Sequence, residues 1–143
     1  NEYPRGSNMS FRKDTFNTIG IFNTKLGRIK SDLGGGEEKD LFMRIYKNNL
    51  QVLYVPDAIV YHFVPDERTT TDFIRRQALG IGYSEKIRTT EVGIKNYILK
   101  ISLEMLKWIA SIILLLYYAL TFKSQKGLMI IKFRYWVMKG LLS

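Results

Sequence analysis

The uncharged run over residues 108–122 places the strongest constraint on how this chain folds. As a helix the run would be about 22 Å long, whereas the apolar core of a bilayer is about 30 Å thick. Lysines stand on both sides of it, at Lys107 and at Lys123 and Lys126. Because both flanks are basic, the positive-inside rule gives no orientation. We therefore expect a helix that lies at a membrane interface or inserts into it shallowly.

The sequence predicts two helices in this part of the chain. The first begins near residue 94 and carries one polar stripe on an otherwise apolar surface, which is the pattern of an amphipathic helix. The second covers residues 128–142 and has lysines and a tyrosine along one side. The alternative is a helical pair that packs on a soluble body or on a further domain. The polar stripe consists of Lys100, Glu104, Lys107 and Ser111.

The charge of the chain is concentrated at its C-terminal end. The formal net charge is +9, of which +7 falls on residues 94–143 and only +2 on residues 1–93. A segment that is both basic and apolar favours an anionic membrane surface over nucleic acid as its partner. The chain has no cysteine, so disulfides and cysteine-based metal sites are excluded. Its first residue is Asn1 rather than methionine, so we expect it to be a piece of a longer protein.

Residues 1–93 show a mixture of helical and strand patterns. Residues 13–18 suggest a helical turn, and residues 37–48 predict a helix with apolar side chains at helical spacing. Residues 51–56 and 58–65 alternate like strands and stop at prolines. Residues 69–85 predict a capped helix that loses regularity at Gly80 and Gly82. The apolar side chains of the helix over residues 37–48 are Leu41, Phe42, Ile45 and Tyr46.

Three consecutive glycines, residues 34–36, precede the densest group of acids in the chain, Glu37, Glu38 and Asp40. Acids in a first helical turn are favoured by the helix dipole, by about 0.3–1 kcal/mol each. The same arrangement also allows the glycines to present a reactive carboxylate. The residues alone leave both interpretations open.

Five segments, taken in order, resemble the C-terminal, acceptor-binding half of a family 2 glycosyltransferase of the GT-A fold. They read GSNMSFRKDTF, IGIF, GGGEEKDLFMRI, QVLYVPDAIVYH and RRQALGIG. The resemblance implies an α/β fold, with residues 1–90 as the acceptor-side part of the glycosyltransferase domain. Residues 91–143 would then form a basic, membrane-associating helical tail.

The resemblance also implies a reaction and a location. A sugar would pass with inversion from a nucleotide-sugar donor to a hydroxyl of a glycan or lipid-linked acceptor, in surface polysaccharide or glycolipid synthesis. The site would be the cytoplasmic face of a bacterial inner membrane. The family's first half carries an Asp-x-Asp motif that is absent here, so we expect this fragment to be inactive alone. The alternative is a non-catalytic membrane-binding or partner-binding module derived from the same fold.

The general base is implied by one motif. The family's Gly-Glu-Asp-x-Asp/Glu-Leu pattern reads GEEKDL here, which puts Glu38 at the base position, with Glu37 as the fallback. The family more often has aspartate there, so the carboxylate of Glu38 stands one methylene further out. Asp40 would support the site by orienting its neighbours or capping the helix.

The other site residues are implied in the same way. Asn8 matches an element beside the donor sugar and acceptor, and Arg75, Arg76 and Gln77 match a region that touches the diphosphate or acceptor. His62 matches a ligand of a divalent cation, Mn²⁺ or Mg²⁺, whose remaining ligands we expect in the missing N-terminal half. The residues by themselves equally allow a turn for Asn8, a solvated helix face for the arginines, and a structural histidine.

Overall fold

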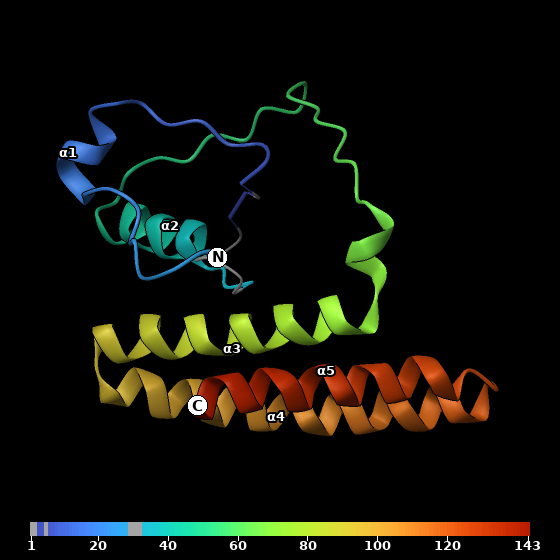
Figure 1. Cartoon of the computed structure of the whole chain (residues 1–143). Coiled ribbons are helices and arrows are strands. Elements are labelled where there is room, and N and C mark those ends of the chain that lie inside the picture. Colours follow the sequence, from blue (N-terminus) through green and yellow to red (C-terminus); the bar gives the residue numbers. More distant parts are fainter. Residues whose placement is uncertain (1–2, 5, 29–32) are drawn as a thin grey trace.

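The computed structural model describes residues 3–4, 6–28 and 33–143, and it arranges them in two layers (Figure 1). The upper layer holds two helices and long connecting segments. The lower layer is a bundle of three long helices. In chain order the elements are α1 (Thr15–Ile19), α2 (Glu37–Lys47), the 3₁₀ helix η1 (Asp66–Thr69), α3 (Thr71–Val92), α4 (Ile94–Leu120) and α5 (Ser124–Leu142).

Helix α2 is the centre of the upper layer, and its prediction is confirmed. It begins after Gly36, whose φ of 93° is a left-handed conformation that glycine adopts without strain. Its apolar face is buried against Ile19 at the end of α1. The ring of Phe11 packs at 5.5 Å from that of Phe42, which closes the other side of this small core. The buried residues of α2 are Leu41, Phe42 and Ile45.

The expected α/β fold is wrong, because the described residues contain only helices and irregular segments and no strand. Residues 51–65, predicted as two strands, run as an extended segment across the top of the upper layer (Figure 1). A strand is stable only beside another strand that pairs its backbone groups, and no described segment does so here. Leu53 and Tyr61 are accordingly 82% and 95% exposed. The strand-like alternation of residues 51–65 therefore corresponds to an extended segment that is not part of a sheet.

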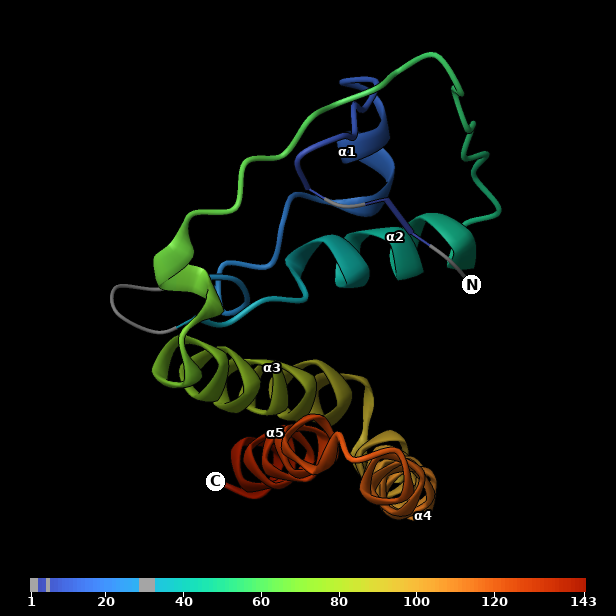
Figure 2. The ribbon, with the colours of Figure 1, turned by 90° about the vertical axis from the view of Figure 1, so that its right-hand side faces the viewer.

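The predicted break at Gly80 and Gly82 is also wrong, because α3 is continuous from Thr71 to Val92. These glycines bring backbones together instead. A Cβ added to Gly82 would overlap the carbonyl oxygen of Val137 on α5, and one added to Gly80 would overlap Leu33. Gly140 of α5 approaches the backbone of α3 in the same way. Helices α3 and α5 thus pack closely, with α2 on the opposite side of α3 (Figure 2).

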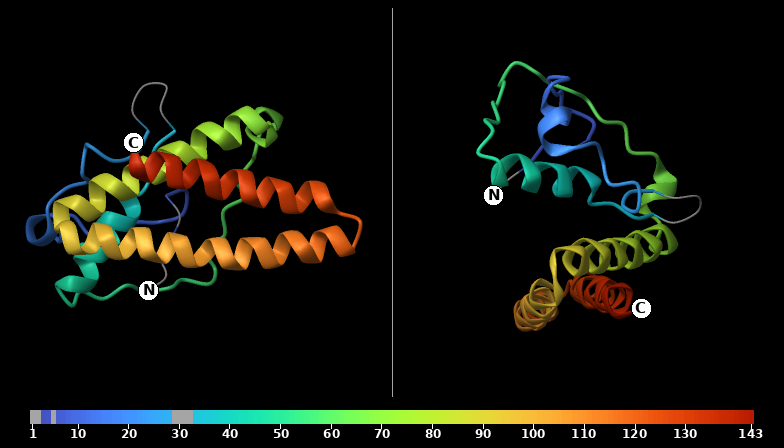
Figure 3. Two further views of the ribbon diagram at one scale, coloured as in Figure 1. Left: turned by 90° about the horizontal axis from the view of Figure 1, so that it is seen from below. Right: turned by 90° about the vertical axis from the view of Figure 1, so that its left-hand side faces the viewer.

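Both C-terminal helices are present as predicted, although α5 begins earlier than expected, at Ser124. They run antiparallel and side by side (Figure 3). Gly127 allows the start of α5 to lie against Leu115 of α4. Within the described ranges, no helix has the combination of length and apolarity needed to cross a membrane.

The close approach of α3 and α5 can be tested by adding single methyl groups. We expect Gly82→Ala and Gly140→Ala each to lower the free energy of unfolding by about 1–3 kcal/mol, because the added Cβ must push the two backbones apart. Urea denaturation measures this change.

Gly35→Ala is the matched control, because a Cβ there meets nothing within 4 Å. We expect it to be neutral within about 0.5 kcal/mol. Equal stability of all three variants would contradict the close packing.

Candidate functional site

The acids that follow the three glycines lie together in the first turn of α2, as expected from the sequence. The side chain of Glu38 is half-buried and lies over Gly6, where an added Cβ would overlap Oε1 of Glu38. Among the described residues, the side chain of Glu38 makes no hydrogen bond or ion pair. Its carboxylate is therefore available to accept a proton from a ligand.

The two neighbouring acids are placed differently. Asp40 pairs with Arg44 one turn further along α2, with 2.8 Å between Oδ2 and Nη2. Arg44 also donates to the carbonyl oxygens of Ile19 and Ile21, so Asp40 holds the arginine that joins α2 to the end of α1. Glu37 packs against Gly27, and its Oε2 is buried without a hydrogen-bond partner in the part of the chain that the structure describes.

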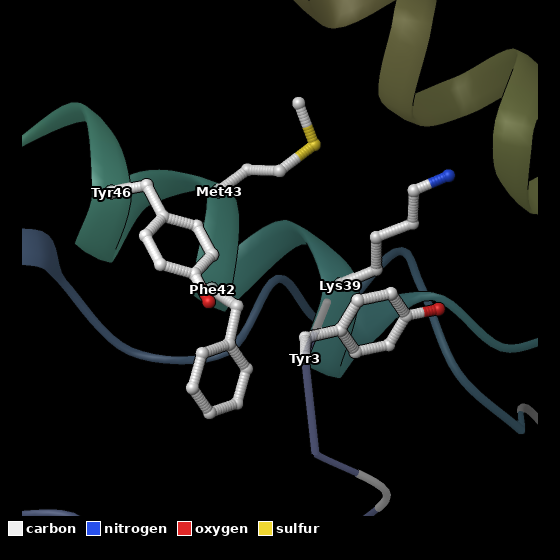
Figure 4. Close-up of a pocket in the computed structure, with 5 residues that line it drawn as sticks. All are labelled: Tyr3, Lys39, Phe42, Met43 and Tyr46. Atoms are coloured by element: carbon white, nitrogen blue, oxygen red, sulfur yellow. The ribbon is translucent and has the colours of Figure 1, made fainter. Parts of the chain in front are cut away.

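Lys39 extends away from these acids toward α3 (Figure 4). Its Nζ lies 2.6 Å from Oε1 of Glu85, which is also held by Arg88 Nη2 at 2.7 Å and by Lys100 Nζ at 3.1 Å. Burial alone would raise the pKa of Glu85, but the hydrogen bonds from Arg88 and Lys39 and the charge of Lys100 outweigh it. The pKa of Glu85 falls to about 2, so this carboxylate is ionised.

A second buried carboxylate, Glu104 on α4, continues this network. Its oxygens lie 3.0 Å from Lys100 Nζ, 2.6 Å from Lys107 Nζ and 3.2 Å from Arg134 Nη1 on α5. Burial opposes the ionised form, yet the hydrogen bonds from Lys107 and Lys100 lower the pKa of Glu104. Because Lys100 contacts both carboxylates, the ion pairs run without a break from α2 through α3 and α4 to α5.

The sequence did not predict that the ion pairs around Glu85 and Glu104 form one connected network. The pairs within one helix, such as Glu85 with Arg88, were visible as spacings of three or four residues. The pairs between helices, such as Lys39 with Glu85, had no signal in the sequence.

A cavity of about 260 Å³ opens along one side of α2, between Lys39 and Tyr46. Figure 4 shows the aromatic rings of Tyr3, Phe42 and Tyr46 around it, with Met43 and Lys39 completing the wall. The lining is mainly apolar, and its single charge is already paired with Glu85. This cavity suits the apolar face of a ligand better than a free diphosphate.

The other predicted site residues lie in two further places. The amide of Asn8 donates to the carbonyl oxygen of Ala58 at 2.6 Å, which ties it to the exposed extended segment that carries His62. Arg75 and Arg76 both pair with Asp72 at the surface of α3, at 2.9 Å and 3.0 Å. Gln77 follows them and is half-buried. No hydrogen bond or ion pair between described residues links these two groups to the acids of α2.

The described residues do not by themselves form a metal site. They include no group of three or more histidine, cysteine, aspartate or glutamate side chains placed to hold an ion. His62 stands on the exposed extended segment and so has no companion ligand among them. The role of a divalent cation stays a prediction.

Comparison with known proteins gives one informative match. The chain is similar to the glucosyl-dolichyl phosphate glucuronosyltransferase of Haloferax volcanii, with 31% identity over 83 residues. The match covers 57% of this chain and 26% of that protein, so the chain aligns with about a quarter of its relative. No protein-family model and no solved structure matches. The similarity supports a relationship to a glycosyltransferase.

The buried position of Glu85 gives a prediction about pH. Its folded-state pKa of about 2 lies below the usual value of 4.5, so the ionised group stabilises the fold above pH 4.5. This contribution, about 3 kcal/mol, is lost as the pH falls from 4.5 toward 2. We expect Glu85→Gln to be strongly destabilised at pH 7, because Lys39 and Arg88 lose their acidic partner and Lys100 keeps only Glu104, and to approach wild-type stability near pH 2. Urea denaturation across this pH range measures the difference.

Glu91→Gln is the control, since Glu91 is on the same helix and pairs with Lys25 at the surface. We expect little loss there at any pH. If Glu85→Gln were no less stable than Glu91→Gln at pH 7, the network would not hold α2 on the bundle.

Proposed function

We propose that this chain is the acceptor-side part of an inverting glycosyltransferase and that Glu38 is its general base. The observation that carries the proposal is the unpaired carboxylate of Glu38, on the first turn of α2, in a chain similar to a glycosyltransferase. The motif GEEKDL, which resembles the base motif of family 2 enzymes, independently selects the same residue.

The arrangement of the three acids explains the choice of Glu38. Oδ2 of Asp40 already accepts hydrogen bonds from Nε and Nη2 of Arg44, so this carboxylate is occupied in holding the arginine. Glu37 faces inward against Gly27, with one oxygen buried. Glu38 is half-buried and unpaired, so an acceptor hydroxyl can reach it.

The chemistry follows from that position. Glu38 accepts the proton of the acceptor hydroxyl while the oxygen of that hydroxyl bonds to the anomeric carbon of the donor. The bond from that carbon to the nucleoside diphosphate breaks at the same time, and the diphosphate leaves with the electron pair. Attack from the side opposite the leaving group inverts the anomeric centre. We expect the donor pocket in residues outside this chain. Contacts with sugar or diphosphate are assigned to Asn8, Arg75, Arg76 and Gln77.

The name of the relative suggests the class of acceptor. That protein is described as transferring a glucuronosyl group to a glucosyl-dolichyl phosphate, which is a sugar on a lipid phosphate. We extend this to a lipid-linked sugar as the acceptor here. The aromatic wall formed by Tyr3, Phe42 and Tyr46 beside α2 offers a surface on which the apolar face of such a sugar packs.

The base assignment is tested in an enzyme that joins this chain to a donor-binding half. With a panel of nucleotide sugars and glucosyl-dolichyl phosphate as acceptor, we expect Glu38→Gln to lower kcat by about 10²–10⁴-fold. The KM for the donor should change little, because Glu38 contacts the acceptor.

Glu67→Gln is the matched control, since Glu67 is an exposed glutamate of η1 far along the chain from the three acids. It should keep wild-type kcat. Loss of activity in Glu37→Gln with full turnover in Glu38→Gln would transfer the role to Glu37 and contradict the assignment.

A further inference from the structure

Helix α4 is packed with its polar side inward. The stripe that the sequence predicted on this helix holds Glu104 and Ser111, and each is only 2% exposed. Glu104 lies among Lys100, Lys107 and Arg134, and Ser111 donates to the carbonyl oxygen of Lys107. The buried interior of the bundle therefore takes the hydrophilic side of α4.

The opposite side of α4 is apolar and uncovered. Six of its residues, spaced three, four or seven apart, share a face about 100° wide that points away from Glu104 and Ser111. Each is more than half exposed. We call this set the outer face of α4. It consists of Leu99, Leu106, Ile109, Ile113, Leu116 and Leu120.

No other part of the described chain covers the outer face. Helix α4 lies at the edge of the bundle, on the side remote from α1 and α2 (Figures 2 and 3). A hydroxyl on this face, that of Ser102, donates to the carbonyl oxygen of Ile98 in the same helix. A largely apolar surface of this length is unusual on a protein that meets only water, and marks a contact with another apolar phase. Inward polar groups with outward apolar groups are the reverse of the ordinary pattern for a surface helix.

The charges around the outer face identify the partner. Glu104 is the only acid in residues 94–143 and it is buried, so the charged side chains that this segment exposes are all basic, and those classed as exposed are lysines. Lys95 stands at the first turn of α4, and Lys123 and Lys126 follow its last turn. Positive groups around an apolar surface match acyl chains bordered by anionic headgroups.

The positions of the lysines also set the orientation. Helix α4 has 27 residues and is therefore about 40 Å long, which separates Lys95 from Lys123 by nearly that distance. Both ends reach the headgroups of the same leaflet only if the helix lies along the membrane plane. We propose that the outer face of α4 is a docking surface for an anionic lipid bilayer, with α4 lying in the plane of one leaflet.

This inference rests on α4 and not on the proposed sugar transfer. It identifies the surface by which the chain reaches a membrane, whether or not Glu38 acts as a base. Docking by this face would leave α2 on the far side of α3, open to the aqueous phase (Figure 2).

Vesicle sedimentation tests the surface. We expect the wild-type chain to bind phosphatidylcholine vesicles that contain phosphatidylglycerol, and more weakly those without it. In the double variant Leu106→Glu with Ile113→Glu, vesicle binding should fall by about 100-fold or more, because two charges replace apolar contacts. The matched control is Leu53→Glu with Tyr61→Glu. It removes two apolar side chains of the extended segment that are more exposed than Leu106 and Ile113. We expect binding of the control within about threefold of wild type.

A second variant keeps the test decisive if the first fails to fold, which circular dichroism would reveal. Lys95→Gln with Lys123→Gln and Lys126→Gln leaves the apolar face intact. It should lose about tenfold or more in binding to anionic vesicles. Its binding to phosphatidylcholine alone should be unchanged. Retention of the full anionic preference would overturn the proposal.

Two further measurements distinguish other occupants and orientations. Oriented circular dichroism on supported bilayers should report α4 lying parallel to the membrane, and a helix perpendicular to it would overturn the proposed docking. Light scattering tests for a second copy of the chain. A dimer that Leu106→Glu with Ile113→Glu dissociates, together with no vesicle binding by wild type, would assign the outer face to self-association instead.

Discussion

The buried carboxylate of Glu85 is the interaction on which the arrangement of the two layers depends. Cations from α2, α3 and α4 converge on it, through Lys39, Arg88 and Lys100. A buried carboxylate that lost these partners would carry an uncompensated charge, which is among the costlier defects in a protein interior. The contact also positions the candidate site, because Lys39 is adjacent to Glu38. Successive helical side chains point about 100° apart, so one turn of α2 binds the bundle and presents a free carboxylate.

The same requirement for charge pairing accounts for the unusual surface of α4. Lys100 connects Glu85 with Glu104, and Arg134 of α5 reaches Glu104 from the other side. Once these groups are paired inside the bundle, the apolar residues of α4 must face outward. The polar interior and the exposed outer face of α4 are therefore two consequences of one packing arrangement. If the outer face docks on a bilayer, the ion-pair network links the docked helix to the turn that carries Glu38.

The features that the sequence predicted correctly are local ones. The periodicity of residues 37–48 and the acids of its first turn identify α2 and place Glu37, Glu38 and Asp40 together. The features that it predicted wrongly depend on partners. Residues 51–65 alternate like strands, but no described segment lies beside them to pair with. Gly82 was predicted to interrupt α3, whereas it allows the backbone of α5 to approach α3 closely. The ion pair between Lys39 and Glu85 joins residues 46 apart, a separation at which composition and spacing carry no information.

The sequence alone determined that two helices form the C-terminal part of the chain, that α4 has a polar stripe and an apolar side, and that this segment is basic. Those properties follow from the order of residues along a helix with 3.6 residues per turn. Only the tertiary structure decided that the polar stripe faces inward. The physical reason is that a buried charge is tolerated only beside opposite charges, and Arg134 comes to Glu104 from another helix, 30 residues along the chain.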